Sequence, residues 1–396
     1  MPSSDGPRLR VLIGVQDAGF NGIETYAEQV AAVGATAGHD ITLLVTSADV
    51  ASTVARRVDS SIHIEHLGLP SPSRAAAIAG RLWDGIAMRR LDQAVRRWVM
   101  QNRNRRFDVA HLNRPVLART IRPIADRVVV GAWFYPHAPM TRVVETWRHN
   151  RGPMLRRLVL AGKSVSYYRG DATGFSAADC IATPTTMLTD QLRGQGLPAE
   201  WCPPPVQVAG ASAADTPRDG KIRLVSISGD LTHPRKNLRA TLDAAAHLAT
   251  SGKSVVVEMI GRNPDPLRRY AADLPKGVEA IFTGPLERTV VHQHVRGADA
   301  LVLPSLYEEW GYVAVEALLL GVPVVTYPVY PFSSMLSGGL GVVAAEMTPA
   351  SLADAIVRVV SHGRGNALAS AAAARYGAEA IGERLSSLWA PARRRA

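Results

Sequence analysis

Two glutamates, Glu308 and Glu316, stand eight positions apart within the stretch PSLYEEWGYVAVEA, which GVPVV follows shortly after. The pattern predicts a buried strand that ends near residue 304, a tight loop, and a helix that begins near residue 310 or 311. Eight helical steps rise about 12 Å. Two carboxylates at such a separation can accept hydrogen bonds from hydroxyl pairs at the two ends of one elongated ligand.

The predicted helix start is itself a binding feature. Gly311 allows a ligand to approach the backbone closely, and the free N–H groups of the first turn, around Trp310 and Tyr312, favour an anion or a sugar oxygen. A second helix start, predicted at residue 237, follows Gly229 and the basic pair Arg235 and Lys236. Two cations at a helix N-terminus form a grip for a diphosphate. The alternative for this pair is an ordinary exposed helix start.

The frame Pro-Ser…Glu-x-x-Gly…Glu-Ala…Gly-x-Pro resembles the signature of the retaining GT-B glycosyltransferases of family four. The resemblance implies that Glu316 holds the ribose hydroxyls of a nucleoside-diphosphate sugar and that Glu308 contacts the transferred sugar. It also implies that Arg235 and Lys236 hold the donor phosphates. The alternative is a strand-to-helix turn with two solvated acids.

Two segments depart from the family pattern. Glu309-Trp310 stands where the family usually has Gly-Phe, and this change is expected to reshape the sugar pocket. Asp230 stands where an arginine is common, so Arg235 is expected to take over its role. The Asp230 departure bears on how active the protein is, as does His137, which is displaced from the family position by intervening aromatic residues.

Glycines in two further loops resemble family positions. Asn21 and Gly22 occupy the place of the family's first Gly-rich loop, which lets backbone N–H groups approach a phosphate. Gly284 follows a predicted strand at 280–282, in a loop that meets the nucleotide base through backbone groups in the family. An ordinary βα turn is the alternative for the first loop. The loops do not distinguish UDP from GDP.

Two histidines are further catalytic candidates in the N-terminal half. His111 ends a segment that resembles the family's Asp-x-x-His, and His137 follows the next strand after the aromatic triplet Trp133, Phe134 and Tyr135. Aromatic faces stack on sugar rings, so the triplet suggests the acceptor side of the site. The alternative for each histidine is a structural role with its hydrogen bonds satisfied.

The elements that must position these residues follow a repeated order of short apolar run, loop and helical pattern. This order is typical of parallel sheets covered by helices. A proline-rich break separates two such series, which predicts an N-terminal Rossmann-like domain at 1–200 for the acceptor, a linker at 201–221 and a second domain at 222–376 for the donor. Residues 377–396 are predicted as a helix and basic tail that pack back on the first domain. The fold class expected is GT-B, with the ligand between the domains.

Composition limits the class of protein. Hydrophobic residues make up 47% and charged residues 20% of the 396 residues, as in a globular protein with a sizeable core. Only Cys180 and Cys202 are present, and no signal-peptide pattern precedes them, so a cytoplasmic location is expected. The net charge of +11 suits a phosphate-bearing donor or an anionic membrane, whereas nucleic-acid motifs are absent.

A basic stretch at 81–106 has apolar residues at helical spacing. It is either a helix that packs on the N-terminal sheet, which we favour, or one that lies on the inner face of the membrane near a lipid-linked acceptor. A second basic stretch at 142–169 is expected on the acceptor side.

The function expected is retaining transfer of a hexose-type sugar from a nucleoside-diphosphate sugar to a hydroxyl of a small molecule, glycan or lipid-linked acceptor. No cofactor and no metal are expected, because the sequence has no Asp-x-Asp pair and no zinc-type cluster. Two alternatives remain: a non-catalytic GT-B protein that binds a nucleotide sugar or a partner, and a phosphorylase-like GT-B enzyme.

Overall fold

The protein consists of two compact units in the computed structural model, which describes residues 7–16, 22–70, 89–132, 154, 172–208 and 219–390. The N-terminal unit comprises Met1–Pro205 and Ala378–Ala396, and the C-terminal unit comprises Val206–Gly377. The division falls inside the predicted linker at 201–221. Trp201 ends a strand, and residues 202–206 are buried.

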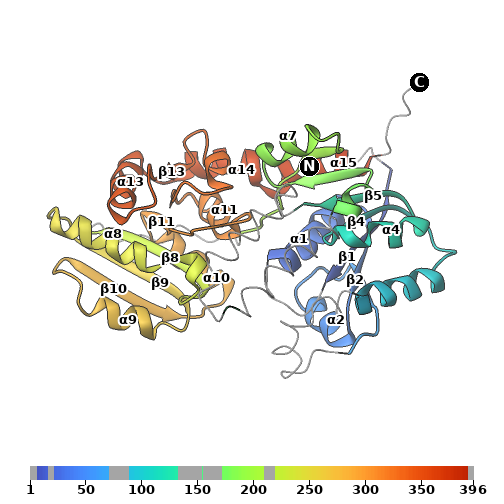
Figure 1. Ribbon diagram of the computed structural model, residues 1–396, viewed down its shortest axis with the longest axis horizontal. Coiled ribbons are helices and arrows are strands. Elements are labelled where there is room, and N and C mark those ends of the chain that lie inside the picture. Colours follow the sequence, from blue (N-terminus) through green and yellow to red (C-terminus); the bar gives the residue numbers. More distant parts are fainter. Residues whose placement is uncertain are drawn as a thin grey trace. The chain divides into compact units, whose positions relative to one another are not determined.

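The N-terminal unit is built on a parallel sheet of seven strands in the order β3-β2-β1-β4-β5-β6-β7 (Figure 1). Its strands are β1 (Arg10–Gln16), β2 (Asp40–Val45), β3 (His63–His66), β4 (Phe107–Leu112), β5 (Ala125–Gly131), β6 (Cys180–Thr183) and β7 (Ala199–Trp201). The inner strands are apolar and buried nearly throughout, as expected for a sheet covered on both faces. Its helical segments include α1 (Gly22–Thr36), α2 (Ala48–Ala55), η1 (Pro115–Leu117), α4 (Ala118–Ile121), η2 (Arg122–Ile124) and α7 (Thr186–Arg193).

The C-terminal unit contains a second parallel sheet, in the order β10-β9-β8-β11-β12-β13. Its strands are β8 (Ile222–Asp230), β9 (Val255–Arg262), β10 (Val278–Gly284), β11 (Ala300–Leu303), β12 (Val324–Thr326) and β13 (Gly341–Val343). Its helices are η3 (Pro234–Lys236), α8 (Arg239–Thr250), α9 (Asp265–Ala271), α10 (Arg288–Arg296), α11 (Tyr312–Leu319), α12 (Phe332–Met335), α13 (Pro349–His362) and α14 (Asn366–Tyr376). Both units therefore have the Rossmann-like architecture predicted.

The strand order of the second sheet fixes where a ligand can bind in this unit. The chain runs from β8 to β9 and β10 on one side and then crosses to β11 on the other side, so the strand order reverses between β8 and β11. Open parallel sheets bind ligands at the carboxyl ends of the strands beside such a switch point. The loop after β8 carries Lys236 and the loop after β11 carries Glu308. The Leu306 backbone N–H joins the two loops by donating to the Arg235 carbonyl oxygen at 2.8 Å.

The last helix, α15 (Ala378–Trp389), belongs to the N-terminal unit and is coloured red at the end of the chain in Figure 1. Its buried side chains Ile381, Leu385, Leu388 and Trp389 share one hydrophobic cluster with the apolar residues of α1 and β2. The Arg127 side chain in β5 also donates to the Leu388 carbonyl oxygen at 2.7 Å. This helix thus completes the core of the first unit.

The basic stretch at 81–106 is described from residue 89 onward, and residues 89–101 are helical. Its apolar residues, among them Leu91, Val95 and Trp98, are buried in a cluster with Phe107 and Leu112 of β4. The favoured interpretation, packing on the sheet, is therefore confirmed for this part of the stretch, whereas residues 81–88 lie outside the described residues. The basic stretch at 142–169 also lies outside them, except for Met154. Within the described ranges, no helix is both long and apolar enough to cross a membrane.

Candidate functional site

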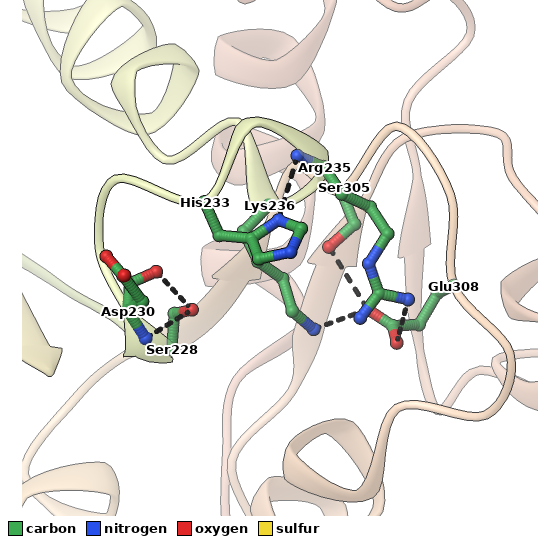
Figure 2. Close-up of polar contacts among 7 residues, drawn as sticks. All are labelled: Ser228, Asp230, His233, Arg235, Lys236, Ser305 and Glu308. Atoms are coloured by element: carbon green, nitrogen blue, oxygen red, sulfur yellow. Dashed lines mark hydrogen bonds and ion pairs between the residues drawn. The ribbon is translucent and has the colours of Figure 1, made fainter. Parts of the chain in front are cut away.

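Three side chains from the two switch-point loops surround the carboxylate of Glu308 (Figure 2). Lys236 Nζ lies 2.6 Å from Glu308 Oε2, and Arg235 Nη1 lies 3.5 Å from Oε1. The Ser305 hydroxyl donates to Oε2 at 3.3 Å. The structure thus brings together Glu308, Arg235 and Lys236, the residues predicted to act on the sugar and the phosphates of the donor.

The local sequence explains why both cations point to the same place. Pro234 opens the short helix η3, where its missing N–H costs nothing. His233 Nδ1 caps the helix by accepting the Arg235 backbone N–H at 3.2 Å (Figure 2). Asn237 then adopts a left-handed conformation with φ of 49°, which ends η3 after a single turn. Arg235 and Lys236 are therefore adjacent residues of one tight turn.

Glu308 is only 7% exposed, and its carboxylate contacts two cations. Burial by itself would raise the pKa of this carboxyl, but the charges of Lys236 and Arg235 and the hydrogen bonds from Lys236 and Ser305 outweigh it and lower the pKa. Burial and the two neighbouring cations lower the pKa of His233, which agrees with its role as a hydrogen-bond acceptor. The site is thus a buried anion held between two cations.

Acidification should test this ion cluster. Because the pKa of Glu308 is lower in the folded protein, its ionised form stabilises the fold above about pH 4.5, its ordinary pKa, and this contribution is lost as the pH falls below that value. We expect wild type to lose more free energy of unfolding than Glu308→Gln between about pH 6 and pH 3 in urea titrations. Parallel pH profiles of the two proteins would contradict the assignment.

Asp230, which stands where the family commonly has an arginine, has a structural role. Its carboxylate accepts the Thr232 backbone N–H at 2.9 Å, the Thr232 hydroxyl at 2.7 Å and the Asn263 amide at 3.0 Å. The hydrogen bonds from Thr232 are the main cause of its lowered pKa. Asp230 therefore shapes the loop that leads to η3, and Arg262 of the neighbouring strand donates to the Gly229 carbonyl oxygen at 2.9 Å.

The N-terminus of α11 begins at Gly311 in a conformation that favours glycine. Its φ is 86°, and an added Cβ would lie 3.0 Å from the Phe332 ring. Among the described residues, no side chain caps this helix N-terminus, which fits the predicted approach of a ligand to the backbone of Gly311 and Tyr312. Trp310 does not fit its predicted place in the pocket. It is 2% exposed, and its ring packs edge-on against Tyr376 of α14.

Glu316 lies in α11, with its carboxylate mostly buried. Arg288 Nη2 contacts Oε1 at 2.7 Å, and His292 Nε2 lies 3.8 Å from Oε2. The expected 12 Å rise from Glu308 to Glu316 is corrected by the structure, because α11 starts only at Tyr312. The first four of the eight steps are therefore loop, and a helical rise does not measure this separation.

The predicted glycines lie at or near the ends of strands and helices in the described structure. Gly229 is exposed near the carboxyl end of β8, Gly284 ends β10 with φ of 75°, and Gly22 is the first residue of α1. Gly229 and Gly284 both lie at the carboxyl edge of the second sheet, since its strands are parallel. This is the edge that carries Glu308.

His111 lies in β4 with no exposed surface. The Trp389 indole N–H donates to its Nδ1 at 3.0 Å, and its Nε2 lies 2.5 Å from the Tyr26 hydroxyl. Burial lowers the pKa of His111 to about 3. A neutral, fully enclosed ring with both nitrogens engaged does not suit a residue that touches substrate. In place of the predicted catalytic role, His111 has a structural role, because its hydrogen bond with Trp389 holds α15 against β4.

The remaining predicted residues lie outside the described residues. They are Asn21 of the first Gly-rich loop, the displaced His137, and the aromatic triplet Trp133, Phe134 and Tyr135. Their predicted roles stay predictions.

The sequence interpretation missed Arg288 and His292, which stand four residues apart on α10 and face Glu316. Their spacing was visible in the run RTVVHQH, since residues four apart share one helix face. No sequence signal, however, indicated that this face meets α11.

The similarity of this chain to known proteins agrees with the fold. Residues 21–202 match the family described as "Glycosyl transferase 4-like domain", and residues 212–377 match "Glycosyl transferases group 1". A 2-deoxystreptamine glucosyltransferase from Streptomyces kanamyceticus is 32% identical over 132 residues, which span 33% of this chain and only 32% of that relative. A phosphatidyl-myo-inositol mannosyltransferase from Mycobacterium leprae is 26% identical over 275 residues, or 67% of each protein.

Among solved structures, a sucrose-phosphate synthase from Thermosynechococcus elongatus has a TM-score of 0.66 at 15% identity, over 97% of this chain and 98% of that one. At an identity this low, the similarity shows a shared fold and nothing about activity. Together with the two family matches, it leads to one conclusion: this chain belongs to the GT-B glycosyltransferases of the group 1, family-four type.

Proposed function

We propose that the protein is a retaining glycosyltransferase that moves a hexose-type sugar from a nucleoside-diphosphate sugar to a hydroxyl acceptor. The observation that carries this proposal is the contact of Lys236 and Arg235 with the buried Glu308 at the switch point of the second sheet. A carboxylate can hold sugar hydroxyls, and two cations can hold a diphosphate. The site offers both groups within one ligand's reach.

The chemistry follows from these charges. The bond between the anomeric carbon and the diphosphate oxygen breaks, and the diphosphate leaves with the electron pair. Lys236 and Arg235 stabilise the negative charge that develops on this oxygen. The acceptor oxygen forms the new bond to the same carbon and gives up its proton to the departing diphosphate oxygen. Because Lys236 and Glu308 neutralise each other without ligand, the incoming phosphate replaces a carboxylate as the partner of the lysine.

We further propose that transfer needs no metal ion and no cofactor, since fixed cations already stand where the leaving group carries charge. The donor is assigned to the C-terminal unit and the acceptor to the N-terminal unit. The acceptor is a small molecule, glycan or lipid-linked hydroxyl. The names of the relatives make 2-deoxystreptamine and a phosphatidylinositol reasonable first acceptors to try.

We place the protein in the cytoplasm, because both of its cysteines, Cys180 and Cys202, are free and buried. Contact with the inner face of the membrane would then depend on charge rather than on inserted apolar residues. Arg89, Arg90 and Arg97 are exposed on the helix at 89–101, whereas its apolar face is buried.

Thermal unfolding with UDP, GDP, ADP and dTDP tests the donor site. A nucleotide at a hundredfold excess over its Kd adds about 2.7 kcal/mol to the apparent free energy of unfolding. We expect a rise in Tm with at least one nucleotide, unchanged by EDTA, and loss of that rise in Glu316→Ala. The matched control is Glu279→Ala, which should keep the rise in Tm. Glu279 is an exposed glutamate of β10 that pairs with Lys221.

The outcomes separate this proposal from its alternatives. No rise in Tm with any nucleotide at millimolar concentration would overturn the donor site. Binding of the nucleotide sugar without release of nucleoside diphosphate, across the acceptor panel, would favour a non-catalytic binder. Turnover that depends on inorganic phosphate would favour a phosphorylase-like enzyme.

A further inference from the structure

Four polar side chains meet where helices α10 and α11 face each other. Arg288 and His292 are four residues apart on α10, and Tyr312 and Glu316 are four residues apart on α11. Residues at this spacing lie on one face of a helix. Arg288 and His292 both approach the Glu316 carboxylate, and the charges of Arg288 and Glu316 both act on the Tyr312 hydroxyl. The four residues therefore form one polar cluster around Glu316.

This cluster leaves hydrogen-bonding capacity unused. His292 is 1% exposed, and in the described part of the chain neither of its ring nitrogens has a hydrogen-bond partner. The Tyr312 hydroxyl is buried and equally lacks a partner among the described residues. Burial raises the pKa of Tyr312 well above its usual range, so this hydroxyl stays a donor. Folded proteins rarely leave buried polar atoms unsatisfied, so several such atoms beside one carboxylate indicate a place for a polar ligand.

We propose that His292 and Tyr312 make Glu316 selective for a ribonucleotide over a 2′-deoxyribonucleotide, with His292 as a positioning residue for the carboxylate. This inference rests on the proposed function, which places the donor's ribose on Glu316. It adds the residues that decide which pentose the site accepts.

The distances suggest how the selection works. Without ligand, Arg288 occupies Oε1, and His292 Nε2 stands 3.8 Å from Oε2, beyond hydrogen-bond length. A ribose diol replaces Arg288 on the carboxylate, and a small shift of Glu316 brings Oε2 within reach of His292. The imidazole then fixes the orientation of both oxygens toward the two hydroxyls. A deoxyribose leaves one of these buried positions unpaired, which a site built for a hydroxyl penalises strongly.

The test is calorimetric titration of the full chain with UDP and 2′-deoxy-UDP, and with the corresponding guanosine and adenosine pairs. We expect wild type to prefer the ribonucleotide by at least about tenfold in Kd. His292→Leu should reduce this ratio to below about threefold, and Tyr312→Phe should lower it by a smaller factor. His292→Gln, whose amide nitrogen can stand in for Nε2, should restore most of the preference.

His294→Leu is the matched control. His294 lies on the same helix but pairs with Glu258 at 2.8 Å, so its loss should leave the ratio unchanged. A structural role for His292 would weaken both nucleotides equally, and an unchanged ratio in His292→Leu would overturn the inference. If His292→Leu does not fold, the Kd ratios of Tyr312→Phe and His292→Gln test the inference in its place. If wild type binds both nucleotides equally, the inference is wrong but the proposed function stands. If wild type binds neither nucleotide, the proposed function is wrong as well.

Discussion

Lys236→Met is expected to lower kcat by about 100- to 1,000-fold, as loss of one group that stabilises a developing negative charge does in other enzymes. The methionine keeps the apolar stem but loses the charge that contacts Glu308 Oε2 at 2.6 Å. Because the lysine is assigned to the leaving diphosphate, kcat should fall by more than the donor KM rises. The measurement is release of nucleoside diphosphate from the nucleotide sugar that wild type uses.

Stability must be separated from chemistry in this experiment. Lys236→Met leaves Glu308 buried with Arg235 alone at 3.5 Å, so a lower Tm is expected. The double variant Lys236→Met, Glu308→Gln removes the unpaired charge and should recover part of the Tm but none of the activity. The matched control is Lys253→Met, which should leave kcat unchanged. Lys253 is an exposed lysine between α8 and β9. A kcat within about threefold of wild type would remove Lys236 from the catalytic machinery.

Trp389→Ala should have the largest effect on stability, about 3–5 kcal/mol, because it empties the space of a fully buried indole. Trp389 is 1% exposed, and a Cβ added at Gly34 of α1 would lie 2.8 Å from its ring, which shows how closely the helices pack. The substitution also leaves the buried Nδ1 of His111 without its donor. The free energy of unfolding is measured in urea.

The conservative variant divides this loss into two parts. Trp389→Phe keeps an aromatic ring but removes the indole N–H, so it should cost about 1–3 kcal/mol. Met100→Ala, at an exposed residue of the same unit, should change stability by less than about 0.5 kcal/mol. A loss below about 1 kcal/mol for Trp389→Ala would show that α15 contributes little to the core.

The central strands of both sheets were predictable because they are rich in apolar residues, as in 11–15 and 300–303. The strands that the sequence did not predict, β3, β7 and β13, all lie at sheet edges and span only three or four residues. An edge strand has a partner on one side only, and β3 reads HIEH, with no buried residue. Such a strand has no hydrophobic pattern to recognise, because burial does not select its residues.

The candidate site was predictable to the extent that it is local in sequence. Glu308, Arg235 and Lys236 each stand in a short motif at a strand end, and parallel strands bring their ends to one edge. Side-chain directions set by distant contacts were not predictable. Trp310 turns into the core because Tyr376 lies beside it, and His111 is enclosed by a tryptophan 278 residues away. Neither partner is indicated by the residues around the motif.

The place of α15 has a consequence for how the protein is made on the ribosome. The N-terminal unit is interrupted in sequence by the whole of Val206–Gly377. Its core lacks Leu385 and Trp389 until translation has passed residue 389, whereas every strand of the second sheet has emerged earlier. The first-synthesised unit is therefore the last to complete its core, because the apolar residues of α1 gain their α15 partners only at the end of synthesis.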